Sequence, residues 1–179
     1  MERREIVRRA IEFDRPPRLP FFLGGSWSDR LRSVIADFPN DVCDCWEMDR
    51  QAGGWFFDNA VEDDWGCQWE ATDLKNMGQV VGHPLKDWSE LASYRPPDPK
   101  NPYYFERIEE GIGDAGDRYV VITSHFNLIE RLHMLHGFAE TLEDFYLAPK
   151  QVEQVLDMVL EWKLDHLREA HRRFGDRVH

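Results

Sequence analysis

The sequence predicts an α/β fold built around a parallel sheet. Residues 119–124, YVVITS, are apolar and β-branched on both faces, which suits a parallel strand covered by helices on its two sides. Residues 149–174 carry apolar side chains at spacings of three and four, which indicates one long helix. Around these segments the second half of the chain alternates between helical and strand patterns, and such alternation is typical of parallel α/β sheets.

The first 40 residues predict a helix, a strand and a second helix. An apolar stripe runs along 2–13, and the two prolines that follow it end the helical pattern. The apolar run LPFFL at 19–23 predicts a buried strand, because glycines close it and lead into a loop. Ser28 is a suitable cap for a helix over 29–37.

The middle of the chain, from about 39 to 103, lacks a regular pattern because glycine, proline, aspartate and tryptophan interrupt it. A structureless loop of that length is unusual in a compact domain. We therefore expect short strands and irregular loops that carry some pairing and some function. Within 81–94 we expect a short helix capped by Asp87 or Ser89.

The second half predicts regular elements up to its last residues. Pro149 suits the first position of the long helix, and Gly175 suits its C-terminal cap. The expected elements are, in order, a helix over 102–113, the strand at 119–124, helices over 126–137, 138–146 and 149–174, and the start of a further strand at 176–179.

Composition excludes several classes of protein. The chain carries 22 Lys and Arg against 34 Asp and Glu, a formal net charge of −12, so a basic surface that follows nucleic-acid phosphates is not expected. Three cysteines do not make a disulfide scaffold. The sequence has neither a signal-peptide pattern at its start nor an apolar stretch long enough to span a bilayer, and we expect a cytoplasmic protein.

Several motifs carry a family resemblance through their order and spacing. DRPPRLPFF follows the first helix, DDWG opens the stretch DDWGCQWE, and HPLKDWSELASYRPPDP precedes the strand YVVITS. LHGFAETLEDFYLAP then leads into the long helix. Over nearly all of its 179 residues the chain resembles the uroporphyrinogen decarboxylase family.

The resemblance implies a (β/α)₈ barrel of the TIM type. Because such a barrel takes roughly 250 residues, residues 1–179 are expected to form one partial domain, the N-terminal half of a barrel. The family includes decarboxylases of uroporphyrinogen that need no cofactor. It also includes zinc-dependent methyltransferases that move methyl groups between corrinoid proteins and thiols.

One departure from the family points to the methyltransferase-like branch. The decarboxylases carry an Arg-Gln-Ala-Gly-Arg motif directly after the first strand, where its arginines meet substrate carboxylates. Here that place reads LGGSWSDRL, with glycines where arginine is expected. The resemblance therefore implies zinc and a corrinoid partner for the full-length protein, with the zinc ligands in the second half of the barrel.

Three functions remain open at this point. The first is zinc-dependent methyl transfer between a corrinoid protein and an acceptor, and the second is decarboxylation of uroporphyrinogen in porphyrin biosynthesis. The third is an inactive fragment, or a half-barrel that works only by pairing with another subunit. We expect no nucleic-acid or membrane partner, and we expect self-association through the open barrel edge and the uncovered apolar stripe of 149–174.

The stretch DDWGCQWE supplies the first candidate site residues. Adjacent residues on a strand point opposite ways, so one of its two aspartates can face a pocket. We expect Asp64 to be the inward acid and Asp63 the solvated one. Trp65 and Trp69 would offer aromatic faces to a flat macrocycle. The alternatives are an aspartate that caps a turn and tryptophans that pack under a long loop.

A second group of candidates follows the strand at 119–124, at the carboxyl end where barrel active sites lie. His125 is expected to donate to a substrate or to act as an acid–base group, and the alternative is a histidine that caps the next helix. Asp58 is an equal candidate for the essential aspartate that the resemblance implies. The expected catalytic residues are Asp58, Asp64 and His125, and the expected substrate-binding residues are Trp27, Trp65, Trp69, Ser124, Asn127 and Arg131. No metal ligand is expected, because the spacing of Cys43, Cys45, Cys67 and His83 fits no zinc motif.

Overall fold

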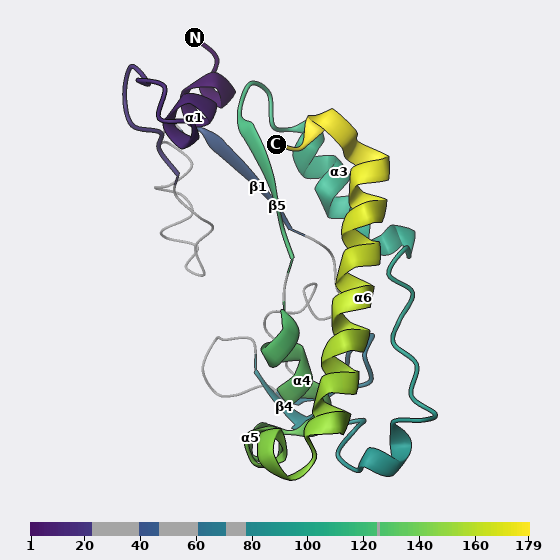
Figure 1. Cartoon of the computed structure of the whole chain (residues 1–179). Coiled ribbons are helices and arrows are strands. Elements are labelled where there is room, and N and C mark those ends of the chain that lie inside the picture. Colours follow the sequence, from purple (N-terminus) through teal and green to yellow (C-terminus); the bar gives the residue numbers. More distant parts are fainter. Residues whose placement is uncertain (23–39, 47–60, 71–77, 125) are drawn as a thin grey trace. The chain divides into compact units, whose positions relative to one another are not determined.

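The computed structural model describes residues 1–22, 40–46, 61–70, 78–124 and 126–179 (Figure 1). The chain divides into two compact units. The first consists of Met1–Glu47, Phe105–Thr123 and Arg173–His179, and the second of Met48–Tyr104 and Ser124–Arg172.

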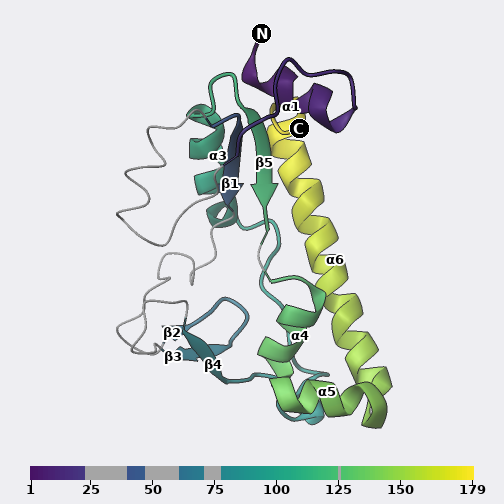
Figure 2. The ribbon, with the colours of Figure 1, turned by 90° about the vertical axis from the view of Figure 1, so that its left-hand side faces the viewer.

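A pair of parallel strands lies at the centre of the first unit. β1, Val42–Trp46, pairs with β5, Tyr119–Thr123, in register along the whole length of both (Figure 2). α1, Arg3–Ile11, contacts both strands, and α3, Glu106–Gly113, contacts β1. The apolar side chains buried in this unit include Ile6, Val7, Cys43, Cys45, Ile108 and Val120.

Two further segments adjoin this pair through backbone hydrogen bonds. Just before β1, the amide of Asp41 donates to the carbonyl of Phe21 at 2.8 Å. On β5, the carbonyl of Val120 accepts from the amide of His179 at 3.0 Å. Backbone groups of successive strand residues point to opposite edges, and Tyr119 bonds towards β1, so His179 lies on the other edge of β5. Across the sheet, the order is therefore the segment at Phe21, then β1, then β5, then the segment at His179, which is also their order along the chain.

The predicted strand at 19–23 is wrong over its described residues. Residues 19–22 form no strand, and the partner of β5 is β1, one of the short strands expected without assigned positions between 39 and 103. The sequence VCDCW hides this strand, because an aspartate and two thiols replace the usual branched side chains. The predicted strand at 119–124 is confirmed as β5, although it is less deeply buried than expected, with only Val120 fully buried.

The second unit contains a small antiparallel sheet and three of the α-helices among the described residues. β2, Val61–Glu62, β3, Gln68–Glu70, and β4, Gln79–Gly82, pair in that order. The helices are α4, Leu128–His136, α5, Phe138–Leu147, and α6, Pro149–Phe174, which ends in the first unit. Short 3₁₀ segments are η2, Trp88–Glu90, η3, Pro102–Phe105, and η4, Gly175–Arg177.

The helical predictions are largely confirmed over the described residues, and the helix expected at 29–37 lies outside them. α6 has the bounds that its apolar repeat predicts, and Asp87 caps η2 by accepting from the amide of Ser89. Gly137 separates α4 from α5 with a φ of +113°, a conformation that favours glycine. Two differences are that η2 is only one turn long, and that a 3₁₀ turn replaces the predicted strand start after Gly175.

The apolar stripe of α6 is largely covered, against expectation. Val152, Val155 and Val159 are buried, while Leu160 and Leu167 remain exposed. Among the described residues, no helix has the length and apolar character needed to cross a bilayer.

Candidate functional site

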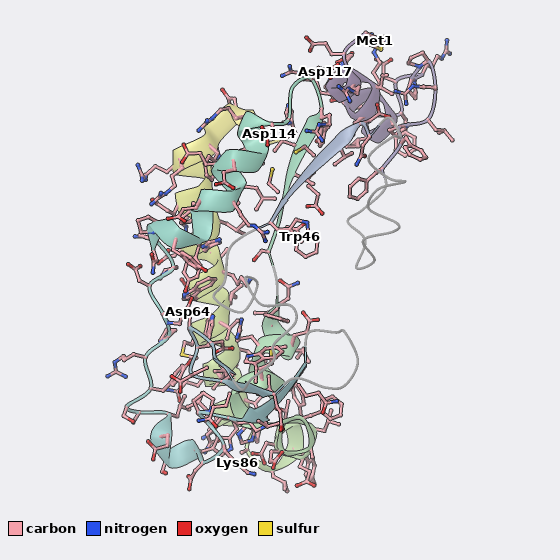
Figure 3. All side chains as sticks on the ribbon, turned by 180° about the vertical axis from the view of Figure 1, so that it is seen from behind. Met1, Trp46, Asp64, Lys86, Asp114 and Asp117 are labelled. Atoms are coloured by element: carbon pink, nitrogen blue, oxygen red, sulfur yellow. The ribbon has the colours of Figure 1, made fainter. Side chains whose placement is uncertain are left out.

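Asp44 is the middle residue of β1, and its carboxylate contacts the last residue of each strand of the parallel pair. Its side chain leaves the face of β1 opposite to the buried Cys43 and Cys45, because strand side chains alternate. Thr123, the last residue of β5, donates its hydroxyl to Oδ1 of Asp44 at 2.5 Å. The indole Nε1 of Trp46 donates to Oδ2 at 2.8 Å, and Figure 3 labels this tryptophan at the end of β1.

The two donors give the Asp44 carboxylate a fixed orientation while the residue remains partly exposed. A carboxylate has about four lone-pair positions, and the two contacts occupy one on each oxygen. The group can therefore accept further N–H or O–H donors from a ligand. The sequence did not predict Asp44 as a site residue. The signal that could have pointed to it is the alternation of one acid with two cysteines in VCDCW.

The opposite face of β1 is closed by close packing. Burial and the neighbouring Cys43 thiol raise the pKa of Cys45 to about 12, which keeps it protonated and poorly nucleophilic near neutral pH. A Cβ on Gly111 of α3 would stand 2.7 Å from Sγ of Cys45. Glycine at this position lets α3 approach the strand, and the two thiols belong to the core.

The stretch DDWGCQWE forms the turn that follows β2, at 63–67, and then β3, at 68–70. Oδ1 of Asp63 accepts from the amides of Trp65 at 2.9 Å and Cys67 at 2.8 Å. The amide of Asp63 donates to the carbonyl of Cys67 at 2.9 Å, and Gly66 takes a φ of +79°. Glycine adopts this conformation without strain, and the carboxylate replaces backbone acceptors that a tight turn lacks.

The second carboxylate oxygen of Asp63 reaches outside the turn. Oδ2 accepts from Nε1 of Trp69 at 3.0 Å and from the guanidinium of Arg131 in α4 at 3.3 Å. The side chains of Asp63 and Arg131 are 0% and 4% exposed, so the ion pair is shielded from water. Breaking a pair of this kind leaves an uncompensated buried charge.

The expected orientation of the two aspartates is reversed. Asp63 is buried, and Asp64 is half-buried and accepts from the hydroxyl of Tyr104 at 3.2 Å. The alternation rule for strands does not apply, because both residues lie in the turn that follows β2. The labelled Asp64 can be followed in Figure 3.

Both tryptophans of the stretch are buried among other side chains. Trp65 and Trp69 are 4% and 2% exposed. The Trp65 ring lies 5.1 Å from that of Trp162 and 4.6 Å from the guanidinium carbon of Arg131. Neighbouring side chains thus cover the faces of both rings. This agrees with the alternative that these tryptophans pack in the interior and do not face a ligand.

The remaining predicted site residues are placed separately. Ser124 accepts from the ammonium group of Lys163, and Asn127 is the N-cap residue of α4, where its backbone amide donates to the carboxylate of Glu130. Of the predicted site residues, the structure thus brings Trp65, Trp69 and Arg131 together around Asp63. Ser124 and Asn127 have other partners. Trp27, Asp58 and His125 lie outside the described residues.

Two of the residues considered for zinc make structural contacts instead. Sγ of Cys67 donates to the carbonyl of Met134 at 3.3 Å, and Nδ1 of His83 lies 2.8 Å from the same oxygen. Burial raises the pKa of Cys67 well above its usual range. Within the described ranges, no three His, Cys, Asp or Glu side chains are grouped to hold a metal ion.

Comparison with protein-family models, with curated proteins and with solved structures finds no match for this chain.

Proposed function

We propose that this chain is the N-terminal half of a (β/α)₈ barrel enzyme of the uroporphyrinogen decarboxylase type. The order of the sheet supports the fold. Phe21 adjoins the start of β1, β1 pairs with β5, and His179 adjoins the other edge of β5. In a doubly wound sheet the strand order reverses at a switch point, whereas in a barrel each parallel strand lies beside the next one along the chain.

We propose further that the enzyme acts on or with a tetrapyrrole, and the observation that carries this is the position of Asp44. Parallel α/β sheets bind ligands at the carboxyl ends of their strands. Asp44 lies in the middle of β1, and its carboxylate is held by Thr123 and Trp46, the residues at that end of the two strands. A preorganised acceptor of this kind needs little rearrangement to bind. Peripheral carboxamides of a corrinoid, or pyrrole N–H groups of a porphyrinogen, are donors of the kind it accepts.

Methyl transfer to or from a corrinoid protein is the reaction we favour, because glycines follow the first apolar run directly, at the place where the decarboxylases carry arginines for a substrate rich in carboxylates. Zinc would activate the acceptor thiol in such a reaction. The described residues provide no ligand set that fits zinc, so no step of the reaction is assigned through it.

Decarboxylation of uroporphyrinogen is the second candidate. The observation that favours it is again Asp44, because one carboxylate can accept several convergent pyrrole N–H groups. Metal-independent release of CO₂ from uroporphyrinogen would support this reaction. Methyl transfer from methylcobalamin to a thiol that requires zinc would support the favoured one.

Binding provides the direct test. Cobalamin and uroporphyrinogen are titrated against the chain, and quenching of its seven tryptophans is followed. Replacing Asp44 by Asn should weaken binding of the recognised tetrapyrrole about tenfold or more, because it removes a charged acceptor worth about 1.5–3 kcal/mol.

Asp114→Asn is the matched control, since Asp114 is an exposed aspartate of the same unit. If Asp44→Asn and Asp114→Asn bind with the affinity of the unmodified chain, Asp44 is not a ligand. If neither tetrapyrrole binds the unmodified chain, the proposal fails.

A further inference from the structure

We infer that the turn at residues 12–15, directly after α1, docks on the exposed apolar face of α5 in a second copy of this chain. The contact lies apart from the reaction proposed above and does not depend on it. It joins two separate molecules, so the turn in the first unit and α5 in the second unit are each described by themselves.

Phe13 occupies a backbone position that favours glycine. Its amide donates to the carbonyl of Ala10 at 3.4 Å, and the amide of Asp14 donates to the carbonyl of Arg9 at 2.8 Å. These two bonds form a Schellman helix end, in which the residue at the place of Phe13 adopts a left-handed conformation. Phe13 accordingly has a φ of +57°, which costs a bulky residue free energy that glycine avoids.

The Phe13 side chain makes no contact that offsets this cost. The ring is 93% exposed, and it has no aromatic or cation–π partner within the described residues. Backbone strain of this kind is concentrated where a chain meets a ligand or a partner. The strain and the exposure together therefore point to a contact with another molecule.

Arg15 gives the same turn a positive charge. It is exposed, has a φ of +43°, and makes no ion pair within the part of the chain that the structure describes. Aromatic residues and arginine are among the side chains enriched at protein interfaces. Pro16 and Pro17 follow directly and restrict the backbone, so the turn loses little conformational freedom on binding.

α5 offers a matching surface because its polar side faces inward. Thr141 is buried, and Oδ2 of Asp144 accepts from Nε1 of Trp88 at 2.6 Å and lies 3.0 Å from Nε2 of His136. These inward contacts fix the rotation of α5 about its axis and hold its apolar side outward. The exposed apolar side chains on that side are Phe138, Leu142, Phe145 and Tyr146.

Complementary charges indicate that a second copy covers this face. Residues 1–22 contain six arginines against four acidic residues, although the whole chain has a net charge of −12. Glu143 lies three residues before Tyr146, so it borders the apolar face of α5. It is exposed and has no ion-pair partner in the described ranges. Arg15 of one copy can therefore pair with Glu143 of another while Phe13 packs on the apolar face.

Sedimentation equilibrium over a range of concentrations tests the role of the Phe13 ring. The unmodified chain should have a concentration-dependent mass above that of a 21.2 kDa monomer. Phe13→Gly should raise the dissociation constant about tenfold or more, because it removes the anchoring ring. Phe13→Tyr retains both the ring and the strained backbone, and it should associate like the unmodified chain.

Thermal unfolding of the dilute monomer gives a second readout. Phe13→Gly should raise the unfolding midpoint by about 2–4 °C, because glycine adopts the left-handed conformation without strain. Removing a ring that served only the fold would lower the midpoint instead. Stability and association should thus change in opposite directions in this variant.

Charge reversal tests the proposed partner. Arg15→Glu and Glu143→Arg should each weaken association about threefold or more, and both changes in one chain should restore it, because opposite charges then meet again. Glu161→Arg is the matched control, since Glu161 is an exposed acid of α6 and its reversal changes the net charge equally. It should not restore the association of Arg15→Glu.

Three results would overturn the inference: a monomer at every concentration, association that Phe13→Gly leaves unchanged, or a double reversal that restores nothing. Association that Leu142→Glu weakens and Phe13→Gly does not would mean that a surface other than the turn covers α5.

Discussion

Asp63 and Asp64 are adjacent in sequence, yet their surroundings give them different physical roles. Asp63 is buried and accepts hydrogen bonds from the amides of Trp65 and Cys67, the indole of Trp69 and the guanidinium of Arg131. Asp64 is half-buried and accepts a hydrogen bond from the hydroxyl of Tyr104. At the residue scale, Asp63 therefore holds the turn together, and a catalytic role for Asp64 stays a prediction.

Substitution should separate the two aspartates by stability. Asp63→Asn leaves the guanidinium of Arg131 buried without a counter-charge and should cost about 3–5 kcal/mol of unfolding free energy. Asp64→Asn keeps an acceptor for Tyr104 and should cost about 1 kcal/mol or less. Urea unfolding followed by tryptophan fluorescence measures both. Equal losses in the two variants would contradict this assignment.

At the scale of elements, Asp41 connects the segment before residue 23 to the start of β1. Its side chain is fully buried and accepts from both terminal nitrogens of Arg18 and from the amide of Phe21. These contacts replace the strand pairing that was predicted for 19–23. Hydrogen bonding with Arg18, followed in importance by the bond from Phe21, lowers the pKa of Asp41.

This contact predicts a pH dependence with a definite sign. Because the pKa of Asp41 is lower in the folded chain than in the unfolded chain, the stabilisation is complete above the unfolded value of about 3.9. It is lost as pH falls from there through the folded pKa. Arg18→Met should reduce the stability of the folded chain at neutral pH, and it should make the loss of stability on acidification less steep. Unfolding midpoints recorded from pH 7 to pH 2 measure the effect, and an unchanged acid profile would contradict it.

At the scale of the whole molecule, the chain combines a strongly acidic composition with an exposed apolar helix. Five large side chains of α5 are at least 45% exposed, at spacings that place most of them on one helical face: Phe138, Leu142, Phe145, Tyr146 and Leu147. Contiguous apolar surface of this kind marks an interaction site or an aggregation risk. Self-association thus stays a prediction. The expected contact surface is now α5, because most of the apolar stripe of α6 is buried.

Light scattering with matched variants tests this prediction. The chain should have an apparent mass above that of a 21.2 kDa monomer, and the double variant Leu142→Glu/Tyr146→Glu should lower it. Leu167→Glu on α6 is the control, because Leu167 is a similarly exposed leucine on a different helix. A monomer at all concentrations, or an equal effect of the control, would contradict the role of α5.

The sequence by itself determined the elements whose signals are local. The bounds of α6 and the glycine between α4 and α5 follow from apolar spacing and from conformational preference within a few residues. β5 was predictable because every residue in it favours a strand. The acidic composition likewise needs no structure to be read.

Only the tertiary structure decided which polar residues are buried and which strands pair. Asp63 is buried in place of Asp64 because its partner Arg131 lies 68 residues further along the chain. β1 forms because β5, almost 80 residues away, supplies its hydrogen bonds, and the same pairing brings Thr123 to Asp44. Such contacts depend on distant backbone groups rather than on local preference, so the pattern of neighbouring residues carries no signal for them.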